Sequence, residues 1–160
     1  MTAKPDGKQR TPEARLRAYI DKLDPENRKL FRSVRAAVRK RFPTANELAY
    51  DYSFALVIGY SPTDRGIDGI VAIRASSTGV SLYFSQGPQL PDPTGLLRGS
   101  GKQTRFIQVE AASQLAQPDV EALIAAAIDQ ARVPLPSEGK GSLIIKSDGA
   151  KKPPRPKPSK

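Results

Sequence analysis

Apolar residues recur every three to four positions over residues 11–41, which is the period of an amphipathic helix. Thr11-Pro12-Glu13 is a helix start, because a hydroxyl can accept a backbone N–H, a proline has helical φ and an acid suits the first turn. Asp24-Pro25-Glu26 repeats this signal, and Pro43 ends the second helix. The inward positions of the two predicted helices are Leu16, Tyr19, Ile20, Leu23, Leu30, Phe31, Val34, Ala37 and Val38.

The period changes to that of strands between residues 47 and 110, where β-branched and aromatic residues are frequent. Ser-Pro-Thr-Asp, Ser-Ser-Thr-Gly and a long Gly/Pro loop separate the apolar segments, and the short spacers favour antiparallel neighbours. The predicted strands are Glu47–Tyr50, Phe54–Tyr60, Gly66–Ala75, Gly79–Phe84 and Arg105–Glu110.

A last helix starts at Gln117-Pro118-Asp119 and ends before Pro134, with a narrow apolar stripe along one side. Helices, then strands, then a helix, without βαβ alternation, predict an α+β fold with helices packed on one face of an antiparallel sheet. Leu143 to Ile145 can add an edge strand or only cover the core.

The composition excludes much ordinary enzymology. The 160 residues include no cysteine and no histidine, so disulfides, the usual zinc sites and catalysis by Cys-His or Ser-His-Asp are ruled out. No run of 18 apolar residues occurs. We therefore expect a cytoplasmic protein that does not enter a membrane.

The net charge of +10 is concentrated at the two ends of the chain. Residues 1–41 carry a net charge of +8, residues 42–136 carry −3 and residues 137–160 carry +5. We expect a flexible N-terminus over 1–10, one domain over 11–136, an extension over 137–147 and a disordered, basic, proline-rich tail over 148–160.

Four blocks of the sequence carry a family resemblance. They are Tyr19-Ile20 before a Leu-Asp-Pro-Glu helix start, Tyr50-Asp51 with Ala55–Gly59, Val80–Phe84 with Gly87, and the glycine-rich Leu90–Lys102. Together they resemble the YdhG-like domain-of-unknown-function family from about residue 19 to residue 132, and residues 143–147 with the basic ending are similar to one branch of it. Phe106 stands where this branch usually has histidine, and Asp51 and Ser53 replace a glycine and a proline.

The resemblance implies a frataxin-like, two-layer fold, and one member of the family is regarded as an iron chaperone. Frataxin-type iron handling uses an acidic surface along the first helix and first strand, since iron without soft ligands prefers carboxylate or imidazole. Here the corresponding helices lie in the +8 segment, which disfavours iron delivery.

The glycine-rich block invites comparison with a nucleotide-binding P-loop but does not match it. Gly95 lies one residue too far from Gly101-Lys102, and Gln103 takes the hydroxyl position. We expect Asp92-Pro93 to start a helical turn that Gly99 ends. The block can be a tight connection only, or its backbone N–H groups can cup a phosphate or carboxylate. The anion-binding candidates are Arg98, Gly99, Ser100, Gly101, Lys102 and Arg105.

The cations of the second helix have two readings, as a solvated face or as a surface for phosphate backbones. No helix-turn-helix pattern, zinc finger or RNP-type aromatic strand occurs, so only non-specific nucleic-acid binding is expected. The candidates for it are Arg32, Arg35, Arg39, Lys151 and Lys152.

Tyr50-Asp51-Tyr52 is the one polar-aromatic cluster that suggests acid-base chemistry. Alternation along a strand puts the two tyrosines on one face and Asp51 on the other, so the three side chains cannot converge. A half-buried strand at the edge of the sheet is the simpler interpretation.

The favoured hypothesis is a non-enzymatic binding or adaptor protein with an anion-binding glycine-rich loop and no cofactor or bound metal. The alternatives are a non-specific nucleic-acid-associated protein acting through the second helix and the tail, and a frataxin-like iron chaperone.

Overall fold

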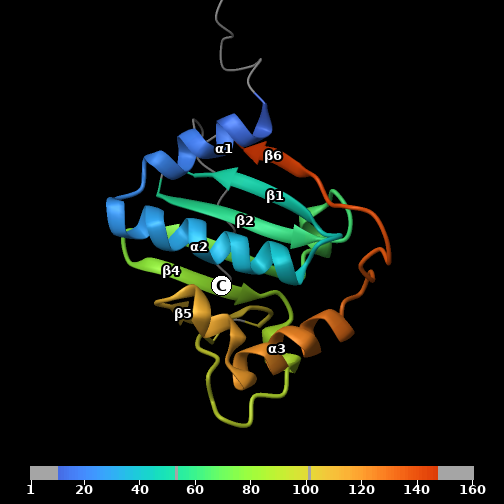
Figure 1. Ribbon diagram of the computed structural model, residues 1–160. Coiled ribbons are helices and arrows are strands. Elements are labelled where there is room, and N and C mark those ends of the chain that lie inside the picture. The colour runs from blue at the N-terminus through green and yellow to red at the C-terminus, as the bar shows by residue number, and fades with distance from the viewer. Residues whose placement is uncertain (1–10, 53, 101, 148–160) are drawn as a thin grey trace, which may run out of the picture.

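The computed structural model describes residues 11–52, 54–100 and 102–147. Three α-helices cover a six-stranded sheet (Figure 1). The helices are α1 (Pro12–Asp21), α2 (Pro25–Arg41) and α3 (Pro118–Asp129). The strands are β1 (Asn46–Asp51), β2 (Ala55–Ser61), β3 (Val71–Ser76), β4 (Gly79–Phe84), β5 (Arg105–Val109) and β6 (Leu143–Ser147).

The predicted helix starts are confirmed. The Thr11 hydroxyl accepts the Ala14 N–H at 3.1 Å and the Asp24 carboxylate accepts the Asn27 N–H at 2.9 Å, each with a proline at the first helical position. Both caps satisfy backbone N–H groups that have no partner inside the helix.

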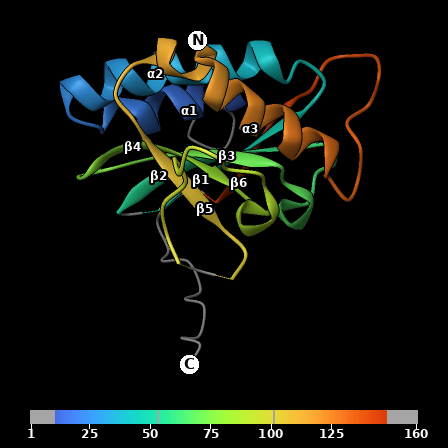
Figure 2. The ribbon, with the colours of Figure 1, turned by 90° about the horizontal axis from the view of Figure 1, so that it is seen from below.

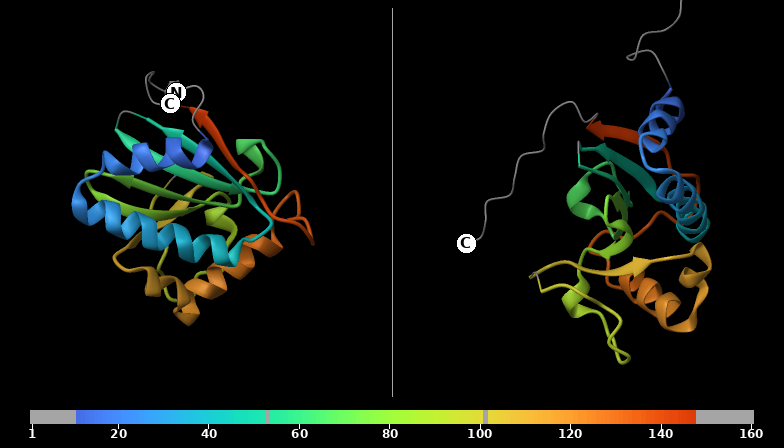
Figure 3. Two further views of the ribbon diagram at one scale, coloured as in Figure 1. Left: turned by 45° about the horizontal axis from the view of Figure 1, so that its top comes forward. Right: turned by 90° about the vertical axis from the view of Figure 1, so that its left-hand side faces the viewer.

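The α+β class is also confirmed. The strand order is β5-β4-β3-β2-β1-β6, and every neighbouring pair is antiparallel except β1 with β6, which is parallel. β6 thus lies outside β1 (Figure 3). β1 is therefore an inner strand, and its expected position at the edge of the sheet is wrong.

The predicted strand Gly66–Ala75 is shorter in the structure and begins at Val71. Residues Gly66–Asp68 form a short 3-10 turn, η2, instead. The hydroxyls of Ser61 and Thr63 stabilise this loop, the first by donating to the Arg65 carbonyl and the second by donating to the Asp68 carboxylate. Local side-chain hydrogen bonds of this kind compete with strand pairing.

The core lies between the sheet and the helices, which all pack on the same side of it (Figure 2). Alternation along the strands supplies the inner face, for example Ile73 of β3 and Leu82 of β4, both fully buried. The helices supply the facing apolar stripes, including Phe31 and Val34 of α2 and Leu123 of α3. The opposite face of the sheet carries no α-helix among the described residues.

Candidate functional site

A cleft of about 860 Å³ opens where the N-terminus of α1, the last turn of α2, the start of β1 and the segment 140–143 meet. Both polar and apolar side chains line it. The charged and hydroxyl-bearing side chains that the argument uses are Glu13, Arg39, Lys40, Glu47, Tyr60 and Lys140. They come from α1, α2, β1, β2 and the segment before β6, so only the tertiary structure brings them together.

Close backbone packing fixes the wall of the cleft that carries Lys140. A Cβ at Gly141 would overlap the carbonyl of Ala45, so only glycine fits there. The Gly141 N–H donates to the Pro43 carbonyl at 3.2 Å, and the Ser142 N–H donates to the Asn46 side-chain carbonyl at 2.9 Å. Lys140 is thereby held beside the C-terminal end of α2.

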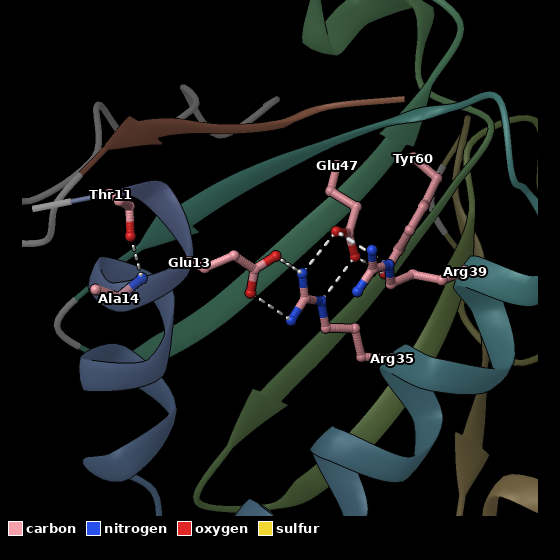
Figure 4. A network of polar contacts seen from close by, with 7 residues as sticks. All are labelled: Thr11, Glu13, Ala14, Arg35, Arg39, Glu47 and Tyr60. Atoms are coloured by element: carbon pink, nitrogen blue, oxygen red, sulfur yellow. Dashed lines mark hydrogen bonds and ion pairs between the residues drawn. The ribbon is translucent and has the colours of Figure 1, made fainter. Parts of the chain in front are cut away.

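Glu47 lies at the floor of the cleft and is buried (Figure 4). Arg35 of α2 donates two hydrogen bonds of 2.8 Å to it, one from Nε to Oε2 and one from an Nη to Oε1. The fully buried Tyr60 hydroxyl donates to Oε2 at 2.7 Å. A bidentate guanidinium and a phenol therefore compensate the burial of this carboxylate.

Two further charged side chains extend the network toward solvent (Figure 4). Glu13 of α1 accepts from Arg35 at 2.9 Å, and the Arg39 Nε lies 3.7 Å from Glu47 Oε1. Glu13 and Arg39 are about half exposed, whereas the Arg35 side chain is 12% exposed. The guanidinium of Arg35 thus bridges α1 to β1 and is largely withdrawn from the surface.

The charges around the cleft do not cancel. The two carboxylates, Glu13 and Glu47, face four cations, Arg35, Arg39, Lys40 and Lys140. Lys40 and Lys140 form no ion pair within residues 11–52, 54–100 and 102–147. The cleft consequently has an excess of two positive charges, which lie at its rim.

Protonation equilibria in the network follow from burial and pairing. Burial, together with the adjacent Glu47 carboxylate, raises the pKa of the Tyr60 hydroxyl well above its ordinary value. Burial opposes the charge on Arg35, but the hydrogen bonds to Glu47 and Glu13 outweigh it and raise the pKa of Arg35. The hydrogen bond from Arg35 lowers the pKa of Glu13.

These contacts limit what the network can do chemically. Both Glu47 oxygens already accept hydrogen bonds, and Tyr60 holds its proton more tightly than a phenol in water. A general base needs an available oxygen or nitrogen and a pKa near the working pH. Glu47 and Tyr60 accordingly lack the features of a general base.

The glycine-rich loop takes a different form from the expected helical turn. Residues 92–95 form a single turn, and the Asp92 carboxylate accepts the N–H groups of Leu96 and Leu97 at 2.8 and 2.9 Å. Gly95 and Gly99 both have positive φ, as a tight connection requires. An internal carboxylate thus fixes the start of the loop, ahead of the anion-binding candidates Arg98 to Arg105.

The cations of the loop are not gathered in one cavity. Arg98 pairs with Phe106 in an isolated antiparallel bridge, and the cavity that it lines is formed with Gln108 and other residues but not with Lys102 or Arg105. Lys102 is exposed, and Arg105 begins β5. Gly99 and Ser100 are exposed, while Gly101 lies outside the described residues.

The cations of α2 mostly face carboxylates of this same chain. Arg32 contacts Asp21 at 3.0 Å, Arg35 contacts Glu13 and Glu47, and Arg39 contacts Glu47. Ion pairs of this kind leave fewer positive charges for a nucleic-acid backbone than the sequence suggested. Lys151 and Lys152, with the rest of the predicted tail and the predicted flexible N-terminus, lie outside the described residues.

Tyr50, Asp51 and Tyr52 divide between the two faces as alternation predicts. The two tyrosine rings stack on the open face with centroids 5.8 Å apart. Asp51 is buried beneath α1, where it accepts from the Lys22 ammonium at 2.9 Å. The three side chains do not form an acid-base site.

The described residues contain neither a metal-ligand cluster nor a membrane-spanning helix. The described residues hold no group of three or more His, Cys, Asp or Glu side chains that could ligate a metal. Within the same residues, none of the helices has the length and apolar character needed to cross a membrane.

Comparisons with known proteins returned no match from family models, curated proteins or solved structures.

One of the cleft residues had a signal in the sequence and two had none. Glu47 alternates along its strand with the buried Ala49, which marks it as inward-facing. Lys140 and Tyr60 had no distinguishing pattern, because their roles depend on where β6 and β2 lie relative to β1.

Proposed function

We propose that this protein is a non-catalytic binding protein that takes a small phosphate- or carboxylate-bearing ligand in the cleft between α1, α2 and the segment 140–143. The ligand class is the one expected from the sequence. The site differs, because Arg98 of the glycine-rich loop lines a cavity that includes neither Lys102 nor Arg105.

The observation that carries the proposal is the pair of lysines at the rim. Lys40 and Lys140 line the cleft, have no carboxylate partner in the described structure and lie above a floor whose own carboxylate is already neutralised. Cations that face a partly enclosed cavity attract anions more strongly than the same cations on a convex surface. Arg39, half exposed and 3.7 Å from Glu47, can donate to the same ligand.

We infer no catalytic role, because the buried ionisable groups of the cleft are already paired. Among the described residues that line the cleft, Glu47 and Tyr60 are the only buried ionisable side chains, and the Tyr60 hydroxyl donates a hydrogen bond to Glu47. Lysines at the rim are exposed to water and give electrostatic attraction and orientation.

A titration of the ¹⁵N-labelled protein with inorganic phosphate, at constant ionic strength, tests the proposal. We expect saturable amide shifts at residues 39–42 and 140–143. Lys140→Ala and Lys40→Ala should each weaken phosphate binding about three- to tenfold, since each removes one charge-assisted contact.

Two matched variants serve as controls. Lys29→Ala removes an exposed cation of α2 that does not line the cleft, and Lys102→Ala removes one from the glycine-rich loop. Neither should alter phosphate binding. If Lys102→Ala weakens it while Lys140→Ala does not, the site is in the loop and the cleft proposal is wrong.

A further inference from the structure

The face of the sheet opposite the helices carries a pair of stacked aromatic rings. Tyr83 of β4 and Phe106 of β5 stack across the two strands at 5.0 Å, and both rings are partly exposed. Tyr50, Tyr52 and Phe54 stack in succession at the end of β1, with centroid separations of 5.8 and 5.7 Å. Tyr52 and Phe54 also line a cavity with residues of the α1–α2 connection, so Tyr50 is the ring of this series that lies clear of that connection. The ring faces of Tyr83 and Phe106 that are not stacked on each other remain for a stacking ligand.

Strand register places an open stretch beside the second stack. Gly59, Ala72, Tyr83 and Phe106 are successive partners across β2, β3, β4 and β5. No atom outside the immediate chain neighbours lies within 4 Å of the position a Cβ would take at Gly59. Small residues thus give a shallow, unfilled strip next to the rings.

No strand residue that points to this face is acidic, although Glu110 follows directly after β5. The side chains that alternation directs outward from β1 to β5 are Asn46, Leu48, Tyr50, Ala55, Val57, Gly59, Ser61, Ala72, Arg74, Ser76, Ser81, Tyr83, Phe106 and Gln108. None of them is acidic, because the acids of these strands, Glu47 and Asp51, point toward the helices.

Arg74 lies in the middle strands of this face, in register with Val57 of β2 and Ser81 of β4. It is half-buried and forms no ion pair within the part of the chain that the structure describes. Arg98, paired with Phe106, lines a cavity at the edge of β5 together with Glu110 and the segment 111–117, and is not counted with this face. A partly buried guanidinium without a counter-charge can form charge-assisted hydrogen bonds with a phosphate or carboxylate of a ligand.

We propose that this open face binds single-stranded nucleic acid, with bases stacked on Tyr83, Phe106 and Tyr50, and with phosphates contacted by Arg74. Aromatic rings on a flat sheet with interspersed cations give sequence-tolerant binding of single strands, because every base has a face that can stack. Bases held in a duplex do not offer those faces. This surface is separate from the cleft and does not depend on the α2 arginines.

Fluorescence anisotropy with labelled twelve-nucleotide oligo-dT, using the full chain, tests the proposal. Tyr83→Leu and Phe106→Leu keep apolar cover but remove the ring, and each should weaken binding at least fivefold. Arg74→Ala should weaken binding several-fold and reduce its salt dependence. Because Arg74 is partly exposed and has no ion pair, this variant remains informative if a ring variant fails to fold.

Three control measurements can contradict the proposal. The same sequence as a duplex should bind at least tenfold more weakly than the single strand. Arg32→Ala, on α2, should leave binding unchanged. Equal loss with Arg32→Ala, or loss with Lys151→Ala and Lys152→Ala but not with Tyr83→Leu and Arg74→Ala, would show that any binding is a general effect of positive charge.

Discussion

The two faces of the sheet differ in whether their charged side chains are paired. On the helix-covered face, each acid of β1 meets a cation from a helix, Glu47 with Arg35 and Asp51 with Lys22. On the open face, the central arginine, Arg74, has no ion pair among the described residues and stands between aromatic stacks.

This difference separates charges that hold the fold together from charges that are available to a partner. Buried pairs link elements that are distant in sequence, and losing one member leaves the other buried without compensation. An unpaired, partly exposed cation has little effect on stability and can contact a ligand without breaking an existing bond. The same distinction divides the cleft, where Arg35 belongs to the first class and Lys40 and Lys140 belong to the second.

Removal of one arginine from each face should have very unequal effects on stability. Arg35→Ala should lower the free energy of unfolding by about 3–5 kcal/mol, because Glu47 stays buried with only Tyr60 as a close donor. Arg74→Ala should lower it by less than about 1 kcal/mol. Urea unfolding followed by circular dichroism measures both. Equal losses would contradict the division between the two faces.

Tyr60→Phe tests the donor that lies deepest in the network. Loss of the hydroxyl leaves Glu47 Oε2 with one fewer hydrogen bond and should cost about 1.5–3 kcal/mol at pH 7.

The pH dependence of this variant has a definite sign. The pKa of Tyr60 is raised above its ordinary value of 10 in the folded protein, so above about pH 10 only the unfolded chain releases this proton. The stability of the wild type should fall there more steeply than that of Tyr60→Phe, and the gap between them should narrow. A constant gap from pH 8 to pH 11 would contradict the raised pKa of Tyr60, which comes from its burial and from the adjacent Glu47 carboxylate.

Glu13→Gln should have the smallest effect, since Glu13 is about half exposed. The pKa of Glu13 is lowered from its ordinary value of 4.5, so its stabilising effect is present above that pH and is lost as pH falls through the lowered value. Urea unfolding at pH 7 and pH 3 should show a difference from the wild type of at most about 1 kcal/mol at pH 7 and a smaller difference at pH 3. A difference that grows toward acid pH would contradict this pairing.

Local signals in the sequence predicted the helix starts well, because Thr11 and Asp24 act within their own first turns. They also predicted which residues share a face of the sheet, including the separation of Asp51 from Tyr50 and Tyr52. Alternation cannot show what lies opposite an inward acid, so the pairing of Glu47 with Arg35 was not foreseen.

The remaining errors have the same origin in contacts between distant segments. The apolar run Leu143 to Ile145 indicates a strand, but its parallel pairing with β1 depends on the path of the preceding segment. The close approach of Gly141 to Ala45 places Lys140 at the cleft and leaves no pattern in the sequence. For the glycine-rich block, the sequence did not show that Asp92 accepts from the backbone donors.

We infer that Lys40 and Lys140 contact a ligand and do not stabilise the fold. The effect of phosphate on the free energy of unfolding tests this inference. Urea unfolding of the wild type and of the Lys40→Ala/Lys140→Ala double variant should be measured with and without inorganic phosphate, the difference between the two proteins removing the general salting effect of phosphate. Without phosphate the two proteins should be equally stable within about 0.5 kcal/mol. At ten times the wild-type dissociation constant, phosphate should stabilise the wild type by about 1.0–1.4 kcal/mol more than the double variant, and an equal gain in both proteins would contradict a ligand role for the two lysines.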